Sequence, residues 1–244
     1  LQAHHGLPLS RCTVIPEVVP FSAQDLVPTT EPVPPLEGNA ADPLLRRLEV
    51  AVETGTFVFG FAGQAIARKG FDLFPQLVRE CERVFAGTPF LAVWLGAAAA
   101  QEQVIVARRD LCLMQLEHRA LLLPPMPTGI SVIRRYAVHG LLSREDPYPV
   151  VALEAAVTAV PTVCFRSSGG IADFVADGCG VAVDYLDLRA FAAALHRLSA
   201  DPESRRRLGE RSRAKVFRES SIDVVAPQLL ASMERAMAAG ARRG

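Results

Sequence analysis

Two carboxylates in the stretch Ser143–Ala155 are the residues best placed for chemistry in this sequence. Asp146 and Glu154 are eight residues apart, with an apolar run between them. That separation is a little over two turns of a helix. Proline suits a first helical position, so a helix opened by Pro147 or Pro149 would start beside Asp146 and carry Glu154 near the same face. Such a carboxylate pair can accept hydrogen bonds from the hydroxyl groups of a sugar.

Further polar groups follow predicted strands and would complete a site for a sugar attached to a diphosphate. The step Ser167–Gly170 comes directly after the buried run Val160–Phe165, and its two glycines let backbone N–H groups approach a ligand closely. Arg68 and Lys69 lie in the loop after another buried run, where a cation near a helix N-terminus suits a diphosphate. Gln64, at the start of that loop, can donate a hydrogen bond to a phosphate.

Each of these features also has a plainer structural explanation. Asp146 is a residue type that often caps a helix, Lys69 would be an ordinary solvated loop charge, and a glycine pair is common in turns. Glu154 would then be a surface charge. However, Glu154 stands between Leu153 and Ala155 in a strongly apolar stretch, which predicts that its carboxylate faces inward or into a cleft. An inward carboxylate needs partners such as hydroxyl groups.

Composition excludes several classes of protein. The chain has 244 residues, of which 50% are hydrophobic, and a formal net charge of zero, so nothing in its charge favours nucleic acid as a partner. Five cysteines form no CxxC pair and five histidines show no metal-ligand spacing, so we predict no metal site. Most cysteines lie in apolar runs, which fits reduced core residues in the cytoplasm. No apolar run reaches the roughly 18–20 residues of a transmembrane segment.

Apolar and amphipathic runs alternate from Phe57 onward, which predicts an α/β fold. The strands are apolar without interruption, and therefore buried on both faces, which indicates a Rossmann-like parallel sheet with helices on both faces. In such sheets ligands bind beyond the carboxyl ends of the strands. The predicted strands are 57–63, 90–96, 120–125, 138–142, 162–165 and 180–183, and the predicted helices are 70–85, 98–116, 130–136, 150–157, 171–175, 188–198, 202–217 and 221–237.

The sequence also suggests three regions. Seven of the 18 prolines fall within residues 1–35, which cannot form a long helix or a central strand. We therefore interpret residues 1–42 as a proline-rich linker or the remnant of a preceding domain. Residues 43–219 would form the Rossmann-like domain, and residues 220–244 a C-terminal helix and tail.

Taken in this order, the motifs resemble the C-terminal half of a glycosyltransferase family 4 (group 1) enzyme of the GT-B fold. The resemblance runs from about residue 58 to residue 217. Its most specific part, residues 143–183, has a carboxylate, seven further residues, a glutamate, a proline-led strand and a Gly-Gly step. The matching stretches are FAGQAIARKGFDLF, FLAVWLG, SREDPYPVVALEAAVTAVPTVCF, SSGGIADFVADGCGVAV and DPESRRRLGERSR.

The resemblance implies the donor-binding domain of a retaining enzyme, which transfers a sugar from a nucleotide-diphosphate sugar without a cofactor or a divalent metal. The acceptor would be a glycan, a lipid or a small molecule. A preceding N-terminal GT-B domain would bind it, and without that domain the isolated chain is expected to be inactive. For this protein we predict a cytoplasmic location, either free or peripheral to the membrane. The alternative is a non-catalytic nucleotide or nucleotide-sugar binding module.

The resemblance also implies a role for each motif residue. Glu154 would hold the ribose, Asp146 the donor sugar and Lys69 the diphosphate, and these three are the predicted catalytic residues. The backbone after Leu123 would touch the base. Gln64 stands where the family often has arginine, and Asp146 where it usually has glutamate. The predicted substrate-binding residues are Gln64, Arg68, Lys69, Leu123, Pro124, Asp146, Tyr148, Pro149, Val150, Glu154, Ser168, Gly169 and Gly170.

Overall fold

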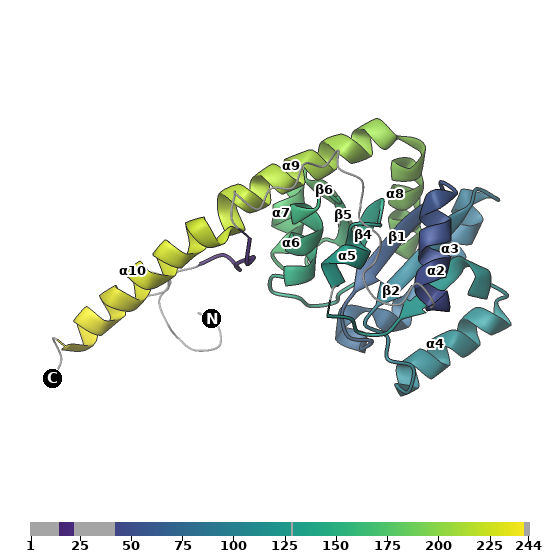
Figure 1. Cartoon of the computed structure of the whole chain (residues 1–244), viewed down its shortest axis with the longest axis horizontal. Helices are drawn as coiled ribbons and strands as arrows, with labels where there is room; N and C mark the ends of the chain where they lie inside the picture. Colours follow the sequence, from purple (N-terminus) through teal and green to yellow (C-terminus); the bar gives the residue numbers. More distant parts are fainter. Residues whose placement is uncertain (1–14, 22–41, 128, 242–244) are drawn as a thin grey trace.

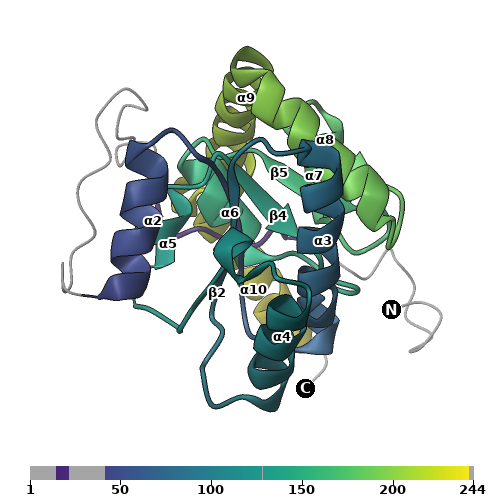
Figure 2. The same ribbon diagram turned by 90° about the vertical axis from the view of Figure 1, so that its right-hand side faces the viewer.

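The structure is a computed structural model that describes residues 15–21, 42–127 and 129–241. At its centre lies a six-stranded, wholly parallel sheet with helices on both faces (Figures 1 and 2). This arrangement confirms the predicted Rossmann-like α/β fold. The strands are β1 (Phe57–Ala62), β2 (Phe90–Leu95), β3 (Ala120–Leu123), β4 (Val138–Leu141), β5 (Thr162–Phe165) and β6 (Gly180–Val183).

The strand order is β3-β2-β1-β4-β5-β6. The chain therefore starts in the middle of the sheet, winds outward to β3, and crosses back to place β4 on the other side of β1. In the register of this central pair, Gly60 lies opposite His139. The loops that follow β1 and β4 leave the sheet in opposite directions, which opens a crevice at their carboxyl ends.

The helices divide between the two faces of the sheet according to the cores that they complete. The helices α3, α4 and α8 pack on one face, and α2, α5, α6 and α7 on the other. The long helix α9 crosses the end of the domain, and α10 extends away from it (Figure 1). Their bounds are α2 (Pro43–Glu53), α3 (Phe74–Phe85), α4 (Glu102–Leu113), α5 (Gly129–Ile133), α6 (Val150–Val157), α7 (Ile171–Ala176), α8 (Leu188–Ala200), α9 (Pro202–Ser220) and α10 (Ile222–Ala241).

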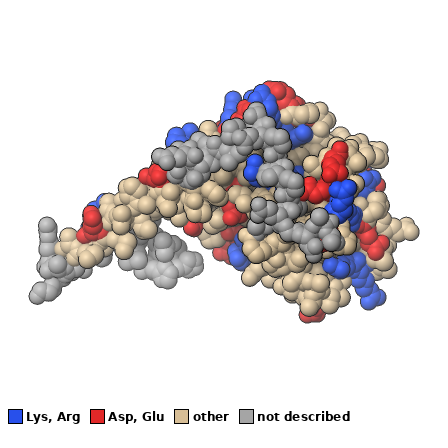
Figure 3. All heavy atoms as spheres, viewed as in Figure 1, with Lys and Arg blue, Asp and Glu red and all other residues tan. Residues whose placement is uncertain are grey.

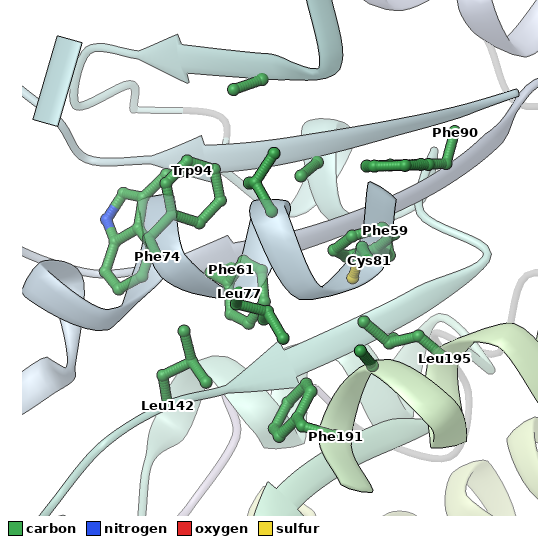
Figure 4. Close-up of a cluster of buried hydrophobic side chains, with 14 of the residues drawn as sticks. Phe59, Phe61, Phe74, Leu77, Cys81, Phe90, Trp94, Leu142, Phe191 and Leu195 are labelled. Atoms are coloured by element: carbon green, nitrogen blue, oxygen red, sulfur yellow. The ribbon is translucent and has the colours of Figure 1, made fainter. Parts of the chain in front are cut away.

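Aromatic side chains fill the core beneath α3 and α8 (Figure 4). Phe61 of β1 stacks on Trp94 of β2, with ring centroids 5.5 Å apart and planes inclined by 16°. Phe71 meets Trp94 edge-on at 4.9 Å, and Phe191 of α8 lies 6.2 Å from Phe61. Such contacts contribute about 0.5–1.5 kcal/mol per pair beyond the burial of their area. They fix β1 and β2, whose carboxyl ends carry loops of the candidate site.

The structure differs from the sequence-based predictions at two helices. The helix predicted from residue 70 begins at Phe74, because two short 3₁₀ turns, Ala67–Lys69 and Phe71–Leu73, come first. Helix α2 was not predicted, although Asp42 caps it by accepting a hydrogen bond from the amide of Leu44 at 2.8 Å. The short, strongly charged sequence of α2 lacks the apolar run that marked the other elements.

Part of the predicted linker contacts the body of the protein. The side chain of Val19 is fully buried, and Val19 forms a parallel bridge with Ser221 at the end of α9. Residues 1–14 and 22–41 of the predicted linker lie outside the described residues. The division of the chain into three regions stays a prediction.

Charge is distributed without a large patch of one sign on the face shown in Figure 3, where acidic and basic side chains are interspersed. Helix α10 differs from that face in exposing apolar side chains. They include Leu229, Leu230, Met233 and Met237, which are 49%, 60%, 54% and 74% exposed.

Among the described residues, no helix is both long and apolar enough to cross a membrane.

The central strand pair predicts one substitution effect. A methyl group added at Gly140 of β4 would overlap the ring of Phe61 in the aromatic core. We expect Gly140→Ala to lower the free energy of unfolding by about 1–3 kcal/mol in urea denaturation, the usual cost of overpacking a core. Gly129→Ala is the matched control, since its methyl group would lie 3.5 Å from Leu95 in ordinary contact. Equal stability of the two variants would contradict this description of the core.

Candidate functional site

A cavity of about 500 Å³ lies at the carboxyl ends of β1 and β2 and beside the loops after β3 and β4. It therefore sits at the point where the strand order reverses, where ligands bind in sheets of this kind. Its volume falls in the range of about 300–1,000 Å³ that is usual for small-molecule sites. It is lined by Ala62, Gly63, Gln64, Lys69, Leu95, Gly96, Pro125, Met126, Asp146, Tyr148, Pro149, Val150, Val151 and Glu154.

Glycine backbone forms the part of the cavity wall nearest to the sheet. Gly63 and Gly96 directly follow β1 and β2 with φ angles of 140° and 108°, which favour glycine. A side chain at Gly96 would collide with the carbonyl group of Gly63. The indole N–H of Trp94 donates to that carbonyl at 2.9 Å. Trp94 of the aromatic core thus holds the backbone of Gly63 at the cavity wall, where no side chain separates that backbone from a ligand.

The cavity contains an ion pair between two residues that are far apart in the sequence. Lys69 Nζ donates a hydrogen bond to Asp146 Oδ2, and the Ser143 hydroxyl donates to the same oxygen at 3.3 Å. The Lys69 and Asp146 side chains are only 18% and 8% exposed. Removing one partner of such a pair would leave a poorly solvated charge, which is strongly unfavourable. The two charges therefore hold each other in place until a ligand offers an alternative.

The loop Ser143–Pro149, which we call the Asp146 loop, is fastened to the loop after β1. Arg144 makes two hydrogen bonds to the carboxylate of Asp72, both at 2.7 Å. Its amide also donates to the carbonyl group of Arg68 at 2.9 Å. In return, Arg68 Nη1 donates to the carbonyl group of Glu145 at 3.0 Å. Arg68 thus supports the loop and is not among the side chains that line the cavity.

The Gly-Gly step after β5 fastens the other side of the Asp146 loop. The amide of Asp146 donates to the carbonyl group of Ser168 at 2.7 Å, and the amide of Gly170 donates to that of Pro147 at 2.9 Å. A side chain at Gly169 would collide with the carbonyl group of Asp146. The two glycines therefore let the loop after β5 come close to the Asp146 loop, whereas the sequence predicted a close approach to a ligand. The Gly170 N–H is already engaged within the protein.

Helix α6 places Glu154 in the cavity wall. It begins at Val150 with Pro149 at its N-cap and ends at Val157, which confirms the helix predicted over residues 150–157, but Asp146 does not cap it. Asp146 lies in the loop instead. Glu154 is half-buried, and burial raises the pKa of its carboxyl group. Within the part of the chain that the structure describes, no hydrogen bond or ion pair reaches that carboxyl group.

His139 lies behind the site and is fully buried in β4. Its Nδ1 is 3.3 Å from the Thr162 hydroxyl, and its Nε2 has no hydrogen-bond partner among the described residues. Burial, together with the positive charge of Lys69, lowers the pKa of His139 to about 3. The imidazole is therefore neutral near pH 7 and carries no charge into the site.

The structure thus brings together about half of the predicted site. Cavity residues that the sequence analysis missed are chiefly Gly63, Gly96 and Met126, and a glycine directly after each of two buried strands was the available signal. The described residues contain no group of three or more His, Cys, Asp or Glu side chains placed to hold a metal ion. Predicted residues that line the cavity are Gln64, Lys69, Asp146, Tyr148, Pro149, Val150 and Glu154, and those outside it are Arg68, Leu123, Pro124, Ser168, Gly169 and Gly170.

Comparison with known proteins relates the domain that holds this cavity to a family. The family model described as "Glycosyl transferases group 1" matches residues 47–215. D-inositol 3-phosphate glycosyltransferase of Corynebacterium diphtheriae is 31% identical over 166 residues, which cover 63% of this chain and 37% of that protein. The chain therefore spans little more than a third of the curated relative that it matches.

Solved structures of low sequence identity share the fold. A glycosyltransferase from Rickettsia africae superposes with a TM-score of 0.75 at 12% identity, covering 97% of this chain and 60% of that one. HepE of Anabaena in complex with UDP-glucose gives a TM-score of 0.68 at 18% identity, covering 81% of this chain and 54% of that one. At these identities the likeness concerns the fold alone.

Glu154 is half-buried and has no partner among the described residues, which predicts a pH-dependent effect on stability. Because burial raises its pKa, the ionised form is disfavoured in the folded state, and stability is lost as the pH rises through that pKa. We expect Glu154→Gln to raise the melting temperature at pH 7. The gain should shrink toward pH 4, below the ordinary carboxyl value of 4.5. Glu234→Gln, at an exposed position on α10, is the matched control and should change little. A gain that is independent of pH would contradict the role of burial.

Proposed function

Because this chain belongs to the group 1 glycosyl transferases, we propose that it is the donor-binding, C-terminal domain of a family 4 enzyme of the GT-B fold. The enzyme transfers a sugar from a nucleotide-diphosphate sugar with retention of configuration. The observation that carries this proposal is the cavity at the strand-order reversal, where Lys69, Asp146 and Glu154 face the same space. A cation and two carboxylates match the diphosphate and the two sets of sugar hydroxyls in such a donor.

Glu154 binds the ribose in this proposal. Its carboxyl group is half-buried and has no partner among the described residues, so two ribose hydroxyls would supply the hydrogen bonds that burial demands. The base would lie beside Pro125 and Met126, which line the same cavity after β3. These residues belong to the segment after Leu123 for which the contact with the base is predicted, whereas the side chain of Leu123 itself is fully buried.

Lys69 and Asp146 bind the reacting end of the donor. The diphosphate takes a share of the Lys69 ammonium group, which Asp146 holds at the cavity wall before the donor enters. Asp146 then accepts hydrogen bonds from the donor sugar. A preformed cation of this kind needs little reorganisation when the leaving diphosphate gains charge, and such preorganisation lowers the barrier of the chemical step.

The chemical step needs no nucleophile from the protein. The bond between the anomeric carbon and the diphosphate oxygen breaks, and the acceptor oxygen bonds to that carbon on the same face. The departing diphosphate oxygen receives the acceptor's proton. The tasks left to this chain are to orient the donor, to stabilise the leaving diphosphate through Lys69, and to stabilise the cationic sugar through Asp146.

The acceptor is bound by a further part of the protein. The chain spans 37% of its curated relative and 54–60% of the two solved structures described above, so these relatives contain a comparable additional part. The exposed apolar side chains of α10 offer a surface for such a part. The isolated chain would bind a donor and transfer nothing. The acceptor would be a glycan, a lipid or a small molecule in the cytoplasm or at its membrane.

Calorimetry with UDP and UDP-glucose tests the proposed site. We expect Glu154→Gln to weaken the binding of both compounds by about 10- to 150-fold, the value of a hydrogen bond to a charged group. Asp146→Asn is the matched carboxylate-to-amide control. It should leave UDP affinity unchanged or raise it, because it releases Lys69. Equal losses in both variants would contradict the separate roles. Binding of neither UDP, ADP nor GDP to the unaltered chain would contradict the proposed function.

Removal of divalent metal gives a second test. The positive charge of Lys69 offsets the diphosphate in this proposal, so UDP affinity should be unchanged in EDTA. Lys69→Met should lower it by at least about tenfold, because the variant lacks the cation. The measurement is calorimetry in EDTA, with and without restored magnesium. A loss of binding in EDTA that magnesium reverses would show that a metal, rather than Lys69, balances the diphosphate.

A further inference from the structure

The loop after β1 presents one charged and one uncharged side chain to the cavity. Among the described residues, Lys69 is the only basic side chain that lines the cavity. Its side chain lies along the backbone of Gly63, where an added Cβ would be 3.7 Å from Lys69 Cδ. Gln64 follows Gly63, lines the same wall, and is exposed. A diphosphate bound by Lys69 would therefore also meet Gln64.

Lys69 already shares its charge with Asp146. The ammonium group donates to the carboxylate, and both side chains are largely buried. Salt screens such a pair little, so its two opposite charges cancel at the cavity wall. Glu154, in the same wall, is acidic. A diphosphate is an anion, so these three side chains together offer it no net electrostatic attraction.

The described charges around the cavity do not change this balance. Beside it, the guanidinium group of Arg144 is paired with the carboxylate of Asp72. Arg68 and Glu145 are both exposed and carry opposite charges, which salt screens. The buried His139 is neutral near pH 7. The N-terminus of α6 contributes only the partial charge of its backbone amides.

We propose that Gln64 is a specificity-determining residue, whose uncharged amide leaves the cavity without net positive charge. The nucleoside, rather than the diphosphate, then supplies most of the binding free energy of a donor. This inference rests on the function proposed above. A cation at position 64 would lie beside the shared Lys69 and attract a diphosphate, whereas a carboxylate there would repel it.

Calorimetry with uridine and UDP tests this proposal on the full chain. The two compounds differ only in the diphosphate, so the ratio of their affinities isolates its contribution. For the unaltered chain we expect UDP to bind within about threefold of uridine. Gln64→Arg should shift the ratio toward UDP by about 10- to 100-fold, as a hydrogen bond to a charged group does, and Gln64→Glu should shift it the other way. The gain in Gln64→Arg should shrink in about 0.3 M sodium chloride, because salt screens an exposed charge.

Gln103→Arg is the matched control. Gln103 is exposed on α4 and lies outside this cavity, so the substitution adds the same charge to the chain at another place. It should leave the ratio unchanged. A preference of the unaltered chain for UDP of about tenfold or more, or a gain in Gln64→Arg no larger than in Gln103→Arg, would overturn the proposal.

Inorganic pyrophosphate separates this proposal from the proposed function, because it has neither base nor sugar. Its binding is measured by the NMR signals of the Gly63 and Gly96 amides, which line the cavity. We expect Gln64→Arg to bind it at least about tenfold more tightly than the unaltered chain. If the unaltered chain bound no nucleotide, the proposed function would fail, and pyrophosphate would still decide the role of Gln64. Equal affinities, or binding to neither protein, would overturn that role.

Discussion

The pairing of Lys69 with Asp146 is the interaction on which the candidate site depends. The two residues are 77 positions apart, and they meet because β1 and β4 are neighbours at the centre of the sheet. Both side chains are largely removed from water. In that setting neither charge is stable without the other or a ligand that replaces it. The pair therefore joins the two halves of the sheet at the point where the cavity opens.

The backbone around this pair is built to hold the Asp146 loop in one place. On one side Arg144 and Arg68 exchange hydrogen bonds with the loop after β1. On the other side Gly169 and Gly170 let the loop after β5 come close enough for backbone hydrogen bonds. A carboxylate on a loop thus gains a placement as defined as that of a residue in a helix.

Glu154 shows the opposite arrangement. It lies in a regular helix, and its carboxyl group is half-buried without a partner among the described residues. An unpaired carboxylate at such a position opposes folding at neutral pH, since burial disfavours the charged form. Sites that bind ligands commonly retain groups of this kind, because the ligand supplies the missing hydrogen bonds. Within the described part of the chain, the cavity therefore combines one carboxylate that has partners with one that has none.

The sequence by itself determined the parallel α/β sheet and most of its elements. Uninterrupted apolar runs such as Phe90–Leu95 are typical of a strand that is buried on both faces, and this pattern is local. It also identified Lys69, Asp146 and Glu154 as cavity residues, since polar groups that follow parallel strands gather at one edge of the sheet. Helix α2 was missed because charged residues interrupt its apolar residues and its burial depends on the distant strands β1 and β3.

Only the tertiary structure decided how each of these residues is used. The sequence could not show that Asp146 precedes helix α6 and pairs with Lys69, because the strand order that joins their loops is not encoded locally. Nor could it separate Gly170, whose N–H is occupied by Pro147, from Gly63 and Gly96, which expose backbone to the cavity. Residue type and spacing fix which chemistry is available. Contacts between loops that are distant in the sequence determine which of these groups remain available for that chemistry.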